Sequence, residues 1–254
     1  MRMSGKELIS LFLRELLAWK EIIARCELLY RTYTYVRRAD LGASERKELQ
    51  KLVGKPIAPG IFASIMGSDP GFNLPRRDSF TLIGGRIFHF SHTKKYSKAD
   101  FDQAYRQFLS SIPELRILLR DSLVDLLKEF MAEAGYQPST EGGGELRFQA
   151  ANRRARAFVF GSIRSIDREH RATAEEDCIL LVPSGENLAP FVEFFKEEGE
   201  RAAEMGLQIW VANMERGTID PFVGYNADMD LYRQFSNPRL AETVRTHWNS
   251  SSSL

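Results

Sequence analysis

The longest uninterrupted pattern in this chain lies near its start and limits what the first half can fold into. Residues 6–40 contain neither glycine nor proline. Large side chains recur there at alternating intervals of four and three residues: Phe12, Leu16, Trp19, Ile23, Cys26, Tyr30 and Tyr33. This spacing predicts one amphipathic helix, about 50 Å long at 1.5 Å per residue. Its stripe either packs on its own domain or forms a homodimer seam.

The segments that follow predict the order helix, turn, helix and hairpin. Ser44 is placed to cap the first helix, which ends near residue 53, and Pro59 suits the first turn of the second. Apolar residues on both sides of Gly84-Gly85 predict two strands joined by a tight turn. The stretch 61–90, with its SDPGF turn and GGRIFHF strand, resembles the second half of winged-helix DNA-binding domains.

This resemblance implies that the second short helix, residues 59–66, enters the major groove of DNA and that the hairpin lies against the phosphate backbone. Cations are then needed around both elements. The candidate DNA-binding residues are the basic side chains around the hairpin: Arg76, Arg77, Arg86, Lys94 and Lys95. The second helix itself carries no lysine or arginine. A winged helix that contacts protein is therefore the alternative.

The charges divide the chain into two halves. Residues 1–97 hold 17 Lys and Arg against 9 Asp and Glu, a net charge of +8, whereas residues 98–254 hold 18 against 25, a net charge of −7. Such a split predicts one domain that meets a polyanion and one that does not. We therefore expect a long helix and a winged-helix DNA-binding domain over residues 1–97, and a second domain over residues 98–254.

The acidic half alternates helical and strand-like patterns, which is typical of a small mixed sheet flanked by helices. Helices are predicted over residues 98–112 and 113–134, followed by a linker-like segment with three consecutive glycines at 137–144. The other predicted elements are strands at 145–150, 156–161, 178–182 and 207–213, a helix at 188–205 and two short helices in the tail. The fold class is therefore α+β, and the second domain is of the α/β type.

One motif in this half predicts chemistry. The apolar strand FVFGS ends at Ser162, and the acidic opening of the next strand, EEDCILLV, starts at Glu175 after twelve residues. The motif resembles the signature of polymerase-β-like nucleotidyltransferases, in which a strand ends in Gly-Ser and the next opens with two acids one residue apart. The resemblance implies that Gly161, Ser162, Glu175 and Asp177 are catalytic, that a nucleotide binds, and that Glu175 and Asp177 share Mg²⁺. The implied second domain is either active or only nucleotide-sensing.

A restriction-endonuclease-like core is the alternative for this domain, because its order of helix, three strands, helix and strand also fits residues 113–213. That chemistry needs an acid-x-Lys on a strand, and residues 179–182 offer no lysine. The alternative function is therefore a non-enzymatic DNA-binding regulator whose second domain serves interaction.

Two observations concern the cellular setting. The longest uncharged apolar run, residues 178–183, is far too short to cross a bilayer, so no membrane partner is expected. The two cysteines, Cys26 and Cys178, lie in apolar contexts without metal-binding spacing and are expected to be reduced core thiols. These features favour a cytoplasmic location.

Overall fold

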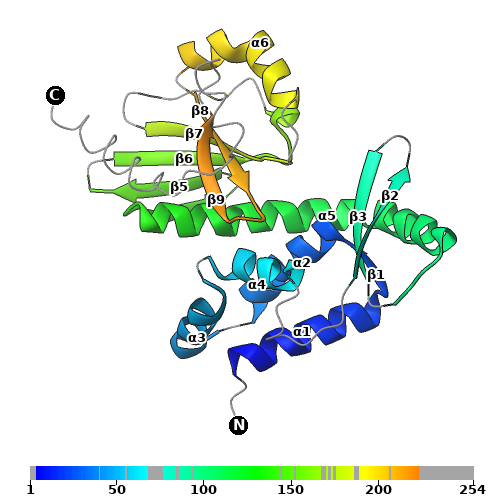
Figure 1. Cartoon of the computed structure of the whole chain (residues 1–254). Coiled ribbons are helices and arrows are strands. Elements are labelled where there is room, and N and C mark those ends of the chain that lie inside the picture. Colours follow the sequence, from blue (N-terminus) through cyan, green and yellow to red (C-terminus); the bar gives the residue numbers. More distant parts are fainter. Residues whose placement is uncertain are drawn as a thin grey trace. The chain divides into compact units, whose positions relative to one another are not determined.

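The structure is a computed structural model. It describes residues 4–39, 41–54, 56–67, 77–83, 86–92, 94–142, 145–151, 153–166, 170, 173, 176–185, 189–205 and 207–222. The chain forms two compact units that divide within one long helix, between Leu119 and Arg120 (Figure 1). The boundary expected from the sequence lies before this helix, near residue 97. Each unit therefore contains a part of the helix.

The N-terminal unit combines helices with a small antiparallel sheet. Its elements are α1 (Gly5–Trp19), β1 (Ile22–Ala24), α2 (Arg25–Arg38), α3 (Ala43–Val53), α4 (Ile57–Met66), β2 (Arg77–Ile83), β3 (Arg86–His92) and the first part of α5 (Lys98–Glu133). The strand order is β1-β3-β2, and β3 is antiparallel to both neighbours. The predicted order of helix, turn, helix and hairpin corresponds to α3, α4, β2 and β3.

The prediction of one long helix over residues 6–40 is wrong. α1 ends at Trp19, and Ile22–Ala24 form strand β1, which pairs with the last three residues of β3. Two consecutive β-branched isoleucines favour an extended backbone. Pairing with β3 supplies hydrogen bonds for that backbone, and α2 starts only at Arg25.

Three residues of the predicted apolar stripe pack inside the chain. Ile23 is fully buried, Tyr33 is 5% exposed and Phe12 is 8% exposed. Phe12 stacks on Tyr35 with ring centroids 4.3 Å apart. A homodimer seam needs such side chains at the surface. These residues instead stabilise the fold of a single chain, and a homodimer of this protein stays a prediction.

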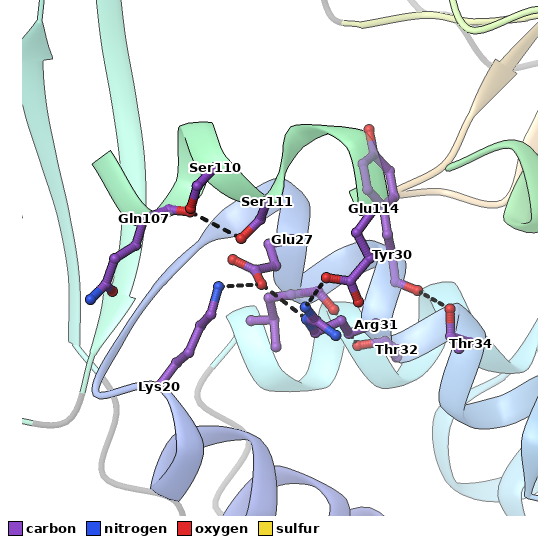
Figure 2. A network of polar contacts seen from close by, with 11 residues as sticks. Lys20, Glu27, Tyr30, Arg31, Thr32, Thr34, Gln107, Ser110, Ser111 and Glu114 are labelled. Atoms are coloured by element: carbon purple, nitrogen blue, oxygen red, sulfur yellow. Dashed lines mark hydrogen bonds and ion pairs between the residues drawn. The ribbon is translucent and has the colours of Figure 1, made fainter. Parts of the chain in front are cut away.

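A buried carboxylate ties α2 to its surroundings (Figure 2). Glu27 is 1% exposed, and its Oε1 accepts hydrogen bonds from Lys20 Nζ at 2.5 Å and from Arg31 Nε at 3.0 Å. Nη2 of Arg31 also donates to Oε2 of Glu114 in α5 at 3.2 Å. Two cations offset the cost of burying the Glu27 charge. The network therefore joins the segment between α1 and β1 to α2 and α5 within the N-terminal unit.

The C-terminal unit is a six-stranded mixed sheet with helices on its two faces (Figure 1). Its elements are the rest of α5, β4 (Gln137–Gly142), β5 (Glu145–Ala150), β6 (Arg153–Val159), a short 3-10 helix η1 (Ile163–Ser165), β7 (Glu176–Pro183), α6 (Ala189–Glu204), β8 (Leu207–Asn213) and β9 (Thr218–Phe222). The strands follow one another in chain order; β6, β7 and β8 are parallel, and the other neighbours are antiparallel. The predicted α+β class and mixed sheet are confirmed.

Strand β7 lies inside this sheet with apolar residues on both faces. Residues 178–182 are all 0% exposed. On one face Leu180 packs with Phe191 of α6. On the other face Phe130 of α5 contacts Trp210 edge to face, with centroids 5.4 Å apart. A continuous apolar run is expected for a parallel strand that is covered on both sides.

Helix α5 is continuous from Lys98 to Glu133, although the sequence predicts two helices that meet at Pro113. Proline removes one helical hydrogen bond, here to the carbonyl of Leu109. Pro113 and Leu109 are both exposed, so water can take the place of the missing donor. Nowhere in the described part of the chain is there a helix long and apolar enough to cross a membrane.

Two further predictions for the C-terminal unit are wrong. The linker-like segment that starts at Gln137 is strand β4, which forms a hairpin with β5. Asp220-Pro221, where a short helix is expected to begin, lies in strand β9. β9 pairs only with β8 among the described strands, and proline is tolerated in such an edge strand. The rest of the predicted tail, residues 223–254, lies outside the described residues.

Candidate functional site

The residues of the predicted nucleotidyltransferase site lie around strands β6 and β7. Gly161 and Ser162 follow the C-terminal end of β6, and the Ser162 hydroxyl accepts a hydrogen bond from the backbone N–H of Arg164 at 3.3 Å, which caps η1. Asp177 is the second residue of β7. Glu175 lies outside the described residues.

The structure does not bring Asp177 together with Gly161 and Ser162. β6 and β7 run parallel, and Asp177 pairs with Ala155 near the start of β6. Six residues of chain, about 20 Å at ~3.3 Å per residue, separate this position from Gly161. Two-metal sites hold their ions about 3.5–4 Å apart, so one site cannot use groups at both ends. The predicted constellation is therefore wrong, because it needs the two strands to be antiparallel.

Asp177 is instead part of a charge-balanced cluster at the start of β6, β7 and β8. Its carboxylate lies 3.6 Å from Nη1 of Arg153 and accepts a hydrogen bond from Nε2 of Gln208 at 3.2 Å. Tyr136, just after α5, is 3% exposed. Burial, the largest cause, and the negative charge of Asp177 raise the pKa of Tyr136, Arg153 lowers it, and the net result is a pKa of about 12. The cluster holds a neutral phenol beside an ion pair.

This cluster does not fit the predicted Mg²⁺ site. The cation and the amide that face Asp177 already occupy its carboxylate oxygens. Within the described part of the chain, no group of three or more His, Cys, Asp or Glu side chains could hold a metal ion. The neighbouring Glu176 lies 3.7 Å from Nε of Arg156. The acids at the start of β7 therefore serve as partners of arginines.

The predicted DNA-binding cations fall into two groups along the β2–β3 hairpin. Arg77 opens β2 opposite His92, and Lys94 and Lys95 follow directly after β3, so these residues share the base of the hairpin. Arg86 opens β3 at the other end, about 20 Å away at ~3.4 Å per residue. Arg76 lies outside the described residues.

Lys94 and Lys95 at the base are exposed. Nζ of Lys94 lies 3.5 Å from Oε1 of Glu21, and both side chains are more than 60% exposed. Exposed ion pairs of this kind contribute little and are screened by salt. Both lysines thus remain available to a phosphate.

The two faces of the hairpin differ. On one face Phe88 and Phe90 pack against aromatic residues of α5, including Phe101 and Tyr105. His92 on this face is 3% exposed, and its ring nitrogens lie 2.8 Å from the Ser79 hydroxyl and 2.5 Å from the Lys94 carbonyl. His92 is therefore a packing residue.

The opposite face of the hairpin is apolar and open to solvent. Phe80 is 69% exposed, Leu82 is 66% exposed and Ile87 is 61% exposed. Phe80 pairs across the strands with His89, whose ring lies 6.3 Å from the Phe80 ring, and Leu82 pairs with Ile87. We call these four residues the exposed hairpin face. The apolar residues of β2 could have indicated this face in the sequence. The prediction of a basic wing considered only the cations.

Helix α4, the expected recognition helix, is largely buried. Ile57, Ile61, Phe62 and Ile65 are at most 7% exposed. Its one polar side chain is Ser64. Because direct recognition of bases needs hydrogen-bonding side chains at the surface, α4 contributes mainly to packing.

Exposed cations that the sequence analysis missed lie on α2 and α3. Arg37 and Arg38 end α2, and Lys47 and Lys51 lie one turn apart on α3; all four are exposed. The adjacent arginines and the i, i+4 spacing of the lysines were visible in the sequence. Arginine and lysine side chains are common contacts of DNA phosphates.

Comparison with known proteins identifies a family for the second half of the chain. Residues 107–237 match the C-terminal domain of DUF6834, a domain of unknown function. The match starts within α5 and includes all of β4 to β9. A search of curated proteins found no match. Because the matched residues make up more than half of the chain, the protein belongs to the DUF6834 family.

Proposed function

We propose that this protein binds DNA through its N-terminal unit, in the manner of a winged helix, and acts as a regulator without nucleotidyl transfer. The observation that carries the proposal is a group of exposed cations on the helices and the hairpin of this unit. The group consists of Arg37, Arg38, Lys47, Lys51, Lys94 and Lys95. The surrounding sequence supports it, because residues 1–97 have a net charge of +8.

These cations support contact with phosphates more than recognition of base pairs. They lie at the end of α2, along α3 and at the base of the hairpin. α4 offers almost no polar side chain for the edges of base pairs. We therefore propose binding that depends strongly on salt and weakly on duplex sequence.

The C-terminal unit has a separate role in this proposal. Its net negative charge over residues 98–254 disfavours contact with DNA. Asp177 is paired with Arg153 and lies at the opposite end of the strands from Gly161. β6 and β7 contain no lysine that could complete an acid-x-Lys nuclease motif. We propose an interaction domain of the α/β type.

The test is a titration of the full chain into a labelled DNA duplex, followed by fluorescence anisotropy at several salt concentrations. Lys94→Gln combined with Lys95→Gln removes two phosphate contacts. The plot of log affinity against log salt should become flatter by about 1.8, at ~0.9 per contact. Arg154→Gln combined with Lys196→Gln removes the same charge from exposed positions of the C-terminal unit and should leave the slope unchanged. Equal effects of the two double variants would contradict the proposal.

A further inference from the structure

The exposed hairpin face is an apolar surface of the N-terminal unit that the proposed phosphate contacts leave unexplained. Its three large side chains are each more than 60% exposed, although most large apolar side chains of the unit are buried. Directly opposed side chains on a sheet lie about 5 Å apart at their Cβ atoms, so the two cross-strand pairs form one continuous patch. Exposed patches of this kind usually mark a binding surface.

The hairpin presents this patch on a fixed support. The other face of the same strands packs on α5 through Phe88, whose ring lies 4.7 Å from Tyr105 and 6.4 Å from Phe108. Phe90 packs on Phe101 in the same layer. The orientation of the exposed face is thereby set by packing behind it.

The charges beside the patch fit a nucleic-acid strand. Residues 77–95 contain four cations, Arg77, Arg86, Lys94 and Lys95, and one acid, Asp78. The cations occupy both ends of the hairpin, and the patch lies between them. Proteins that bind single strands combine aromatic and apolar side chains, on which bases stack, with cations that follow the backbone.

Two other occupants fit less well. The edges of base pairs in a duplex are recognised by hydrogen-bonding groups, and His89 is the one polar side chain of the face. A second copy of the chain would need about 800 Å² of interface per partner. A fully exposed side chain of this size offers about 200 Å², so the three partly exposed apolar side chains supply roughly 400 Å².

We infer that the exposed hairpin face binds unpaired bases of a DNA strand, with Phe80 as the stacking residue and the cations at both ends of the hairpin on the phosphates. This inference rests on the proposed DNA binding and names its substrate class, single-stranded or locally melted DNA. It assigns base contact to the hairpin, which is the element that a winged helix would place on the backbone of a duplex.

The test compares one single-stranded oligonucleotide with the duplex of the same sequence, by fluorescence anisotropy with the full chain. Phe80→Ala should weaken binding of the single strand about tenfold, since one stacked base contributes about 1–3 kcal/mol and 1.4 kcal/mol is a factor of ten. Binding of the duplex should change less than about twofold. Phe80→Tyr keeps an aromatic ring and should retain the affinity. Ile117→Ala removes a side chain of α5 that is also exposed, at 62%, and serves as the control.

The outcomes separate this inference from the proposed function. Equal losses on both DNAs, or no loss on the single strand, would overturn the inference while DNA binding stands. No binding of the wild type to either DNA would overturn both. A wild type that sediments as a dimer, and as a monomer after Phe80→Ala, would assign the face to a second copy and overturn the inference. Thermal melting of each variant checks that it is folded.

Discussion

Gly60 of α4 lies where this helix meets the last turn of α3. A Cβ atom at this position would lie 2.9 Å from the carbonyl carbon of Val53, 3.1 Å from the Val53 Cβ, and closer still to the Val53 oxygen. The obstacle is backbone at the end of α3 and cannot rotate away as a side chain can. We therefore predict that Gly60→Ala forces α3 and α4 apart.

The expected loss of stability in Gly60→Ala is the difference between two opposing effects. Overpacking of a core contact costs about 1–3 kcal/mol, and the upper end applies where backbone must move. Alanine within a helix gains about 0.8–1.0 kcal/mol over glycine. The free energy of unfolding of the N-terminal unit should thus fall by about 2 kcal/mol. At about 4–8 °C per kcal/mol for a small domain, its melting temperature should fall by roughly 10 °C.

The assay is thermal unfolding of the full chain, followed by calorimetry. Gly161→Ala is the matched control, because a Cβ at Gly161 meets no atom within 4 Å and the residue is exposed. This variant should melt within about 2 °C of the wild type, since exposed substitutions change stability by about 0.5 kcal/mol at most. A Gly60→Ala protein with the same melting temperature as the wild type would refute the close packing of α3 on α4.

Three further predictions concern the polar groups. Glu27→Gln removes the buried carboxylate charge that Lys20 and Arg31 share and should lower the free energy of unfolding by about 3 kcal/mol in urea denaturation; Glu114→Gln at an exposed position should change it by less than about 1 kcal/mol. The pKa of Tyr136 is raised to about 12, so its contribution to stability is complete below about pH 10, the ordinary tyrosine pKa, and is lost as the pH rises toward 12. In urea denaturation, the free energy of unfolding should fall as the pH rises from about 10 toward 12, and this fall should be smaller in Tyr136→Phe. Mg²⁺ with any nucleoside triphosphate should leave the melting temperature unchanged, and a shift that Asp177→Asn abolishes would restore the nucleotidyltransferase hypothesis.

The sequence predicted the elements whose pattern is local. Strand β8 has the predicted bounds, 207–213, and β7 contains the predicted apolar run 178–182, because a buried strand shows its burial directly in its residue types. β1 was not predicted, since three residues carry almost no periodic signal and their extended form depends on pairing with β3. Its omission produced the false long helix.

The prediction of the candidate site also failed because the pattern of residues does not show how strands pair. The motif that ends in Gly161-Ser162 and resumes before Asp177 has the same spacing whether the two strands run parallel or antiparallel. The direction of pairing is set by the chain between them and by the rest of the sheet, and it decides whether the residues meet. For the hairpin, residue types predicted the cations, but the register was needed to separate Arg86 from Arg77 and to place Phe80 beside His89.

The salt dependence of binding to a DNA duplex tests the central claim most directly. The full-length wild type would be titrated by anisotropy between about 50 and 200 mM salt. With the six exposed cations that we propose as phosphate contacts, we expect measurable binding at low salt and a slope of log affinity against log salt between about −3 and −5, at ~0.9 per phosphate contact. A slope near zero, or no binding at the lowest salt, would contradict the claim that this unit binds DNA.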